Sequence, residues 1–124
     1  MTVFATENRI WDQDETRPRG ELQDIQLARL RETVERVSGV PFYRDRLAAD
    51  GVTADAICSL DDLRRLPFTV KDDLRTHYPL DLLAVSREKL ARIHGSSGTT
   101  RKPTFVSYTA GDLDRWANLC GRLL

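Results

Sequence analysis

The sequence predicts an α/β fold whose first two-thirds are mostly helical and whose last third is a strand–loop–strand–helix unit. Up to residue 89, apolar residues recur at helical spacing between capping residues and prolines. From Leu90 onward, "LARIHG" and "TFVSYT" are typical of short strands, and a segment rich in Gly, Ser and Thr separates them. We therefore divide the chain into an extended arm at 1–15, a helical region at 16–89 and the strand–loop–strand–helix unit at 90–124.

The arm is polar, and Trp11 is its expected anchor to the rest of the molecule. A long helix follows: Thr16 and Pro18 are typical of a helix start and Gly39 of a helix end. This helix carries one apolar stripe at spacings of three and four residues, namely Leu27, Leu30, Val34 and Val37. A shorter helix is expected between Pro41 and Gly51, with three inward-facing side chains, Phe42, Tyr43 and Leu47.

Three four-residue motifs resemble capping boxes, each with Asp in the place of Glu. They are "SLDD" at 59–62, "TVKD" at 69–72 and "TAGD" at 109–112. The first two are expected to begin short helices in the helical region. The third begins a final helix with a strongly apolar stripe, formed by Leu113, Trp116, Ala117, Cys120 and Leu124. Such a stripe must be buried against another layer, and two strands do not form an independently stable sheet.

Composition excludes several classes of protein. The 124 residues include nineteen basic and nineteen acidic side chains, so the balanced charge gives no indication of nucleic-acid or membrane-surface binding. No apolar run is long enough to span a membrane, and the first residues lack the pattern of a secretory signal. Cys58 and Cys120 are far apart and are expected to be buried free thiols. A cytoplasmic protein is expected.

The segment "GSSGTTRKP" at 95–103 combines three features that suit a phosphate ligand. Gly95 and Gly98 permit unusual backbone conformations, so successive N–H groups can converge on an anion. Four hydroxyl side chains add donors, and Arg101 and Lys102 add positive charge. The pattern is not a Walker A motif, because a strand and not a helix follows. A solvated linker is the alternative interpretation of the same composition.

Five ordered blocks of the chain resemble one family. They are "LQLARLRETVERV", "VPFYRDRL", "LDDLRRLPFTVKDDLRTHYP", "RIHGSSGTT" and "DLDRWA". Together they are similar to the N-terminal part of the phenylacetate-CoA ligase and coenzyme F390 synthetase family, within the adenylate-forming (AMP-binding) superfamily. The resemblance extends from about Trp11 to the end of the chain. It implies the truncated N-terminal part of an adenylate-forming enzyme fold.

Members of this family join a carboxylic acid to ATP, release pyrophosphate and pass the acyl group to coenzyme A. The resemblance implies ATP with magnesium and CoA as cofactors, an aryl carboxylic acid as substrate, and a loop that holds the ATP phosphates. Matched position by position, the implied phosphate-binding residues are Ser96, Ser97, Gly98, Thr99, Thr100 and Lys102. No residue is assigned a catalytic or metal-binding role. Donors aimed at the departing pyrophosphate would stabilise the charge that develops there.

The chain departs from the family pattern in two ways. Arg101 stands where the motif has glycine, which would strain the backbone if that position needs a positive φ. The segments that bind adenine and ribose, hold magnesium and supply the late lysine have no counterpart. We therefore expect a fragment of a ligase that is inactive alone. The alternative is a stand-alone regulatory or dimerisation protein with a vestigial loop, so enzymatic activity stays open.

The expected partners follow from the uncovered final helix. Because its stripe lacks a partner layer, we expect a homo-oligomer, in particular a dimer, or association with a complementing C-terminal ligase piece.

Overall fold

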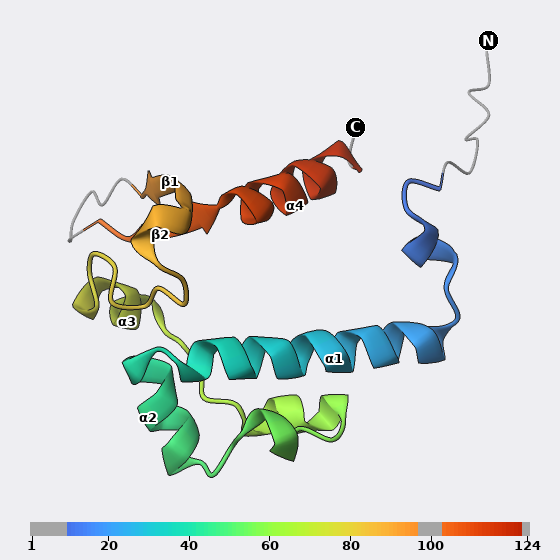
Figure 1. Cartoon of the computed structure of the whole chain (residues 1–124), viewed down its shortest axis with the longest axis horizontal. Helices are drawn as coiled ribbons and strands as arrows, with labels where there is room; N and C mark the ends of the chain where they lie inside the picture. Colours follow the sequence, from blue (N-terminus) through green and yellow to red (C-terminus); the bar gives the residue numbers. More distant parts are fainter. Residues whose placement is uncertain (1–9, 97–102, 123–124) are drawn as a thin grey trace.

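The computed structural model describes residues 10–96 and 103–122, as a helical region and a hairpin followed by one helix (Figure 1). The mostly helical α/β fold predicted from the sequence is confirmed. The elements in chain order are η1 (Gln13–Thr16), α1 (Arg19–Ser38), α2 (Pro41–Ala49), η2 (Ala54–Ala56), η3 (Leu60–Arg65), α3 (Lys71–Thr76), η4 (Arg87–Lys89), β1 (Leu90–Gly95), β2 (Phe105–Thr109) and α4 (Ala110–Gly121).

The core of the molecule lies between α1, α2 and the 3-10 turns that follow them. Val34, Leu47, Val52 and Ile57 are buried against one another, and Ile57 is fully inaccessible. The predicted stripe of α1 faces this core, with Leu27, Leu30 and Val37 packed at its edge. Burial of each such large aliphatic side chain contributes about 1.5–3 kcal/mol, so this cluster is the main source of stability among the described residues.

The helix boundaries follow the sequence signals with two exceptions. Gly39 ends α1 as predicted, but Pro18 precedes its first turn without a side-chain cap. The Thr16 hydroxyl instead donates to the carbonyl of Gln13, 2.9 Å away, because η1 places it next to that group. At α3 the position before the helix is Val70 and not Thr69.

The structure explains why Thr69 does not cap α3. Its hydroxyl donates to Tyr43 Oη at 3.1 Å, which ties the segment before α3 to α2. Asp73 accepts the backbone N–H of Val70 at 2.8 Å, so only this half of a capping box forms, since valine has no acceptor. The "SLDD" and "TAGD" boxes do form, around η3 and α4 respectively.

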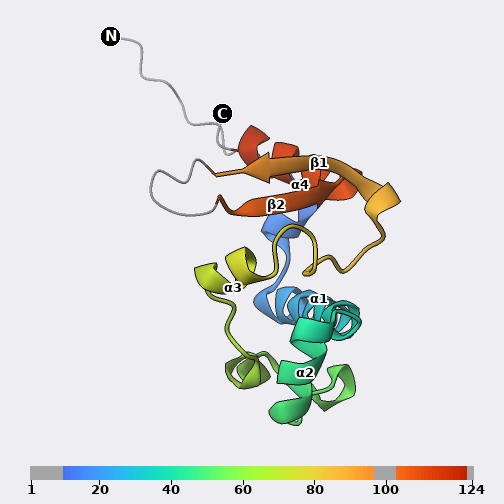
Figure 2. The same ribbon diagram turned by 90° about the vertical axis from the view of Figure 1, so that its left-hand side faces the viewer.

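β1 and β2 form an antiparallel hairpin, and α4 follows β2 directly. The register pairs Gly95 with Phe105 and His94 with Val106, and it shifts between Leu90 and Arg92. Figure 2 shows the hairpin and α4 on one side of α3, and α1 and α2 on the other. The hairpin packs on α4, whereas α1 packs on α2, η2 and η3.

The segment before α1 returns to the far end of α4 (Figure 1). Trp11 Nε1 donates to Asn118 Oδ1 at 2.7 Å, and the indole lies against Gly121. Arg122 forms an ion pair with Glu15. The predicted anchoring role of Trp11 is confirmed. Within the described ranges, none of the helices has the length and apolar character needed to cross a membrane.

Candidate functional site

The Gly/Ser/Thr-rich segment lies between the ends of the two paired strands. Two hydrogen bonds join its ends: Ser96 N–H donates to the Thr104 carbonyl at 2.9 Å, and Thr104 N–H donates to Ser96 Oγ at 3.2 Å. Among the six predicted phosphate-binding residues, Ser96 is therefore placed at the base of the loop. The other five, Ser97, Gly98, Thr99, Thr100 and Lys102, lie outside the described residues, as does Arg101.

Gly95 at the end of β1 lies close to the paired strand and does not have the unusual φ that its sequence context suggested. A Cβ at this position would lie 3.0 Å from Phe105 Cε1 on the paired strand. The only described glycine with a positive φ is Gly51, after α2. Phe105 in turn packs its ring on Tyr78, with ring centres 5.1 Å apart. The base of the loop is thus fixed by a close contact between a backbone and an aromatic ring.

Thr104 is the only polar residue among the described ones that is buried, at 8% exposure. Its Oγ1 has no hydrogen-bond partner within the described ranges. A buried hydroxyl without a partner is costly, so the position favours a donor or acceptor at the end of the hairpin. Together with Ser96 Oγ, it places two hydroxyl groups at the base of the segment. This chemistry fits a phosphate ligand.

The final helix starts at a complete capping box directly after β2. Thr109 N–H and the Thr109 hydroxyl donate to Asp112 Oδ2 at 2.9 and 2.7 Å, and Asp112 N–H donates to Thr109 Oγ1 at 3.2 Å. The backbone N–H of Thr109, with its hydroxyl, holds the pKa of Asp112 below its ordinary value. This carboxylate is therefore committed to the cap and not free to act as a base.

The other titratable residues considered for the site, two histidines and Asp73, make contacts that stabilise the fold. The His94 ring lies against Tyr108 and Trp116, with ring centres 5.0 and 5.6 Å away. His77 Nδ1 lies 2.9 Å from the carbonyl of Asp73 at the end of α3, as expected for a helix-end residue. Accepting the N–H of Val70 lowers the pKa of Asp73, with a further contribution from Arg46. Within residues 10–96 and 103–122, no three metal-ligating side chains of the His, Cys, Asp or Glu type cluster.

The expectation of buried thiols is wrong for both cysteines, which are exposed. Cys58 follows Ile57, and it is Ile57 that fills the core. Cys120 belongs to α4, which has no buried residue. The apolar neighbours in the sequence misled the prediction, because adjacent residues on a turn or helix point in different directions.

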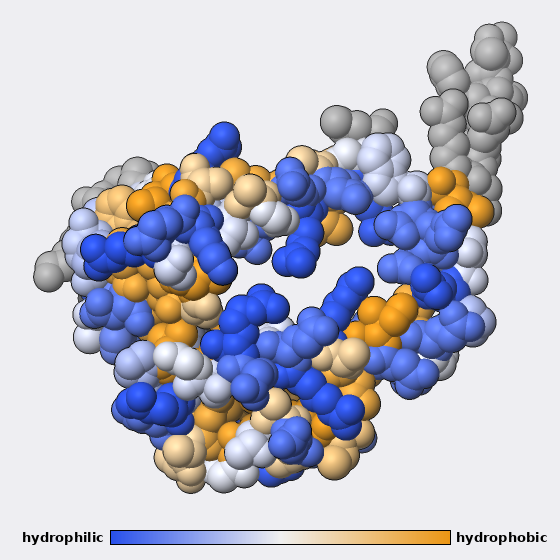
Figure 3. Space-filling view, viewed as in Figure 1, coloured by the Kyte–Doolittle hydropathy of each residue, from blue (hydrophilic) through white to orange (hydrophobic). Residues whose placement is uncertain are grey.

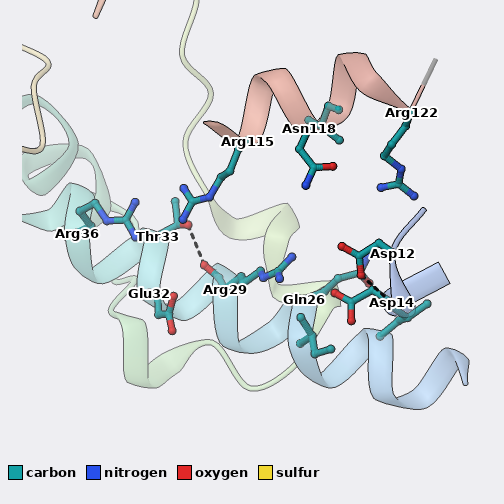
Figure 4. Close-up of a pocket in the computed structure, with 13 residues that line it drawn as sticks. Asp12, Asp14, Gln26, Arg29, Glu32, Thr33, Arg36, Arg115, Asn118 and Arg122 are labelled. Carbon is teal, nitrogen blue, oxygen red and sulfur yellow. Dashed lines mark hydrogen bonds between the residues drawn. The ribbon is translucent and has the colours of Figure 1, made fainter. Parts of the chain in front are cut away.

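A second feature had no signal in the sequence. A cavity of about 630 Å³ separates α1 from α4, and arginines of both helices point into it (Figure 4). Arg29 and Arg36 come from α1, and Arg115 comes from α4. These positions are far apart in the chain, so only the folded arrangement brings them together.

The sequence is similar to that of several phenylacetate-coenzyme A ligases. The ligase of Escherichia coli is 48% identical over 114 residues, which cover 91% of this chain and 26% of the ligase. That of Thermus thermophilus is 50% identical over 111 residues, or 89% of this chain and 25% of the ligase. That of Pseudomonas putida is 43% identical over 124 residues, or 98% of this chain and 28% of the ligase. No model of a known protein family matches the chain.

The fold is similar to part of a solved ligase. The crystal structure of 2-hydroxyisobutyryl-CoA ligase, in complex with 2-HIB-AMP and CoA, superposes with a TM-score of 0.74 at 30% identity. The superposition covers 94% of this chain and 28% of that ligase. The chain thus spans about a quarter of the length of the relatives it matches. Sequence and fold agree that the chain is similar to one part of the phenylacetate-CoA ligases, which are adenylate-forming enzymes.

Proposed function

We propose that this chain supplies the ATP-phosphate-binding part of an acyl-CoA ligase that activates a carboxylic acid, of which an aryl acid is the expected class. The observation that carries the proposal is the segment at 95–103, set between two paired strands in a chain 43–50% identical to phenylacetate-CoA ligases. In this reaction the acid joins the AMP part of ATP, pyrophosphate leaves, and coenzyme A then takes the acyl group.

The geometry at the base of the segment supports this role. The paired ends of β1 and β2 and the Ser96–Thr104 hydrogen bonds hold both ends of the segment together. A fixed base lowers the entropy cost of converging several donors on one phosphate. Ser96 Oγ accepts from Thr104 N–H, and its own hydroxyl proton stays available for a phosphate oxygen. Lys102 would add a charge-assisted hydrogen bond.

We further propose that the 124-residue chain does not catalyse the reaction alone. The relatives it matches are about four times as long, and the residues that contact the nucleotide base, the metal and CoA are expected in their other parts. Isolated chain is therefore expected to show no acid-dependent exchange of pyrophosphate into ATP. Exchange above the no-acid background would contradict this expectation.

Pyrophosphate titration of the isolated chain tests the loop assignment. Loss of one charged hydrogen bond costs about 1.5–3 kcal/mol, so Lys102→Ala is expected to weaken binding roughly 10- to 100-fold. The matched control is Lys89→Ala in η4, at the opposite end of β1, which should leave binding unchanged. Arg101→Gly restores the residue of the family motif and shows whether the arginine raises or lowers the affinity for pyrophosphate. Equal affinity of the Lys102→Ala and Lys89→Ala variants would refute the phosphate-loop assignment.

Association is the second part of the proposal. Trp116 and Leu119 of α4 are 45% and 59% exposed, and Val106 of β2 is 42% exposed. Exposed apolar side chains on adjacent elements favour association, either as a homo-dimer or with a complementing ligase piece. Light scattering of the isolated chain tests the first form, and Trp116→Glu is expected to shift a dimer toward monomer. A monodisperse monomer at high concentration would exclude the homo-dimer and leave the ligase piece.

A further inference from the structure

The cavity between α1 and α4 is walled on two sides by helices and at one end by the segment before α1. Figure 3 shows this hollow in the centre of the molecule, with hydrophilic side chains around it. Its volume is about 630 Å³, and the lining residue Asn118 is tied to the segment before α1 by the hydrogen bond from Trp11. The hairpin and α3 lie toward the opposite end (Figure 1). A space of this size is within the range that accommodates a ligand or several side chains of a partner.

The charges around this cavity are unevenly distributed. Arg29, Arg36 and Arg115 line its middle and the end toward the hairpin, and Figure 4 shows Arg115 directed from α4 toward α1. Asp12 and Asp14 line the end toward the arm, where Arg17 pairs with Asp14. Glu32 is the one carboxylate of the lining that lies on α1.

Among the described residues the three arginines have few close ion-pair partners, and two carboxylates act on them from a longer distance, Asp14 on Arg29 and Asp112 on Arg36. Within the described ranges, neither Arg29 nor Arg36 has a carboxylate oxygen within 4.0 Å, and Arg115 reaches Asp112 only at 3.8 Å. Arg122, which also lines the cavity, already pairs with Glu15. Guanidinium groups that converge from two helices repel one another unless an anion lies between them. The arrangement therefore favours a carboxylate-bearing occupant.

We infer that the cavity between α1 and α4 seats an acidic segment of the remaining ligase polypeptide, whose carboxylates pair with Arg29, Arg36 and Arg115. This inference rests on the proposed function, in which the chain is one part of a longer ligase. The chain corresponds to 28% of a solved ligase of similar fold, so in such a ligase the other 72% is polypeptide that can pack against this part. The lining also includes apolar side chains, Leu22, Ile25 and Leu119, which suit an amphipathic polypeptide better than a small free anion.

A chimera provides the test, in which this chain replaces the matching 114 residues of the Escherichia coli phenylacetate-CoA ligase. Phenylglyoxal modifies accessible arginines, and mass spectrometry reports the rate at each position. We expect Arg36 and Arg115 to react about tenfold more slowly in the chimera than in the isolated chain, since reaction then requires local opening. Arg64, whose side chain is 87% exposed on η3, is the internal control and should react equally in both.

Charge reversal provides the second measurement. Arg36→Glu and Arg115→Glu are expected to lower the melting temperature of the chimera by several degrees, because each places a carboxylate opposite another. The same variants should shift the isolated chain by less than about 1 °C, as expected for surface substitutions. Arg64→Glu should have that small effect in both proteins. Equal shifts for all three variants in the chimera would overturn the inference.

Other occupants of the cavity would give different experimental results, and each of the following results would overturn the inference. Protection of Arg36 in the isolated chain by pyrophosphate would identify a small-anion site. Protection that rises with the concentration of the isolated chain would identify a second copy. A chimera that does not fold would show that the remaining polypeptide does not fit this chain. Pyrophosphate exchange by the chimera separates this inference from the proposed function. Exchange activity without protection of Arg36 and Arg115 would contradict the binding of an acidic segment in the cavity. Protection of these arginines without exchange activity would contradict the proposed function.

Discussion

The helical region and the hairpin with α4 differ in how much of their apolar surface they bury themselves. All five buried apolar residues of the described chain lie between Val34 and Ile57. Among the described residues from Leu90 onward the one buried residue is Thr104, directly before β2, and α4 exposes Trp116 and Leu119. The two regions have similar proportions of apolar residues, but only the helical region buries several of them completely.

The difference indicates which region carries its own stability. α1 and α2 are folded around a core supplied by their own connections, since Val52 and Ile57 come from the turns after α2. A two-stranded hairpin with one helix cannot enclose a comparable core. In a ligase as long as the relatives, further polypeptide would be available to bury the apolar face of the hairpin and α4. The candidate phosphate loop thus belongs to the less self-sufficient region.

The largest expected effect is at the centre of the core. Ile57→Ala removes a fully buried side chain and is expected to lower the free energy of unfolding by about 2–5 kcal/mol. Urea denaturation followed by circular dichroism measures it. Leu119→Ala, at a position 59% exposed on α4, is the matched control and should cost less than about 0.5 kcal/mol. Comparable losses for the two variants would contradict the contrast between the regions.

A smaller effect is expected at the junction of β2 and α4. Thr109→Ala removes the hydroxyl that accepts the N–H of Asp112 and donates to its carboxylate. Loss of such a cap costs about 0.5–2 kcal/mol. Amide hydrogen exchange should show faster exchange in the first turn of α4, with the core of α1 unchanged. Unchanged exchange at Asp112 would show that the capping box contributes nothing to α4.

A still smaller effect is expected at the contact between the arm and α4. Asn118→Ala removes the hydrogen bond from Trp11 Nε1, and since both residues are exposed we expect a loss of at most about 1 kcal/mol. The emission of Trp11, measured in a Trp116→Phe background, should shift to longer wavelength as the indole enters water. Gln at position 118 keeps an amide oxygen and should restore part of the contact. Identical Trp11 emission in the Asn118→Ala, Asn118→Gln and Asn118 proteins would show that the hydrogen bond to Asn118 does not hold the indole in place.

The pH dependence should be modest and confined to acid. Backbone N–H donors hold the pKa values of Asp62, Asp73 and Asp112 below their ordinary value. Such carboxylates bind protons less readily in the folded chain than in the unfolded one. Their stabilisation is complete above the unfolded pKa, about 3.9, and is lost as the pH falls through the lower folded values. Asp112→Asn should reduce this acid loss, and an unchanged pH profile would exclude a contribution from the cap.

Local signals in the sequence predicted much of the fold. The stripe of α1, the stop at Gly39 and the boxes at Ser59 and Thr109 depend on residues within one or two turns, so spacing alone reveals them. By spacing alone, the Thr69 hydroxyl suits a helix cap. Its contact with Tyr43 on α2 depends on tertiary packing, which spacing does not encode. The exposure of both cysteines likewise depends on which face each element turns inward.

The candidate site likewise has one part that the local sequence predicts and another that depends on the tertiary structure. The composition of 95–103 predicts a phosphate loop, and the structure adds the Ser96–Thr104 contacts that join the ends of this segment. The arginine-lined cavity could not be predicted, because Arg36 and Arg115 line one space only through the path of the arm and the direction of α4. A balanced net charge conceals such a local excess.

Phenylacetate-dependent exchange of pyrophosphate into ATP by the Escherichia coli chimera tests the function of the loop most directly. With the loop of this chain in place, the chimera is expected to catalyse exchange. Lys102→Ala should lower the rate about 10- to 100-fold, the equivalent of one charge-assisted hydrogen bond in the transition state. Lys89→Ala should change the rate by less than about twofold, as expected for a surface residue remote from the loop. A folded chimera whose exchange rate is the same with lysine or alanine at position 102 would contradict the assignment of the phosphate loop.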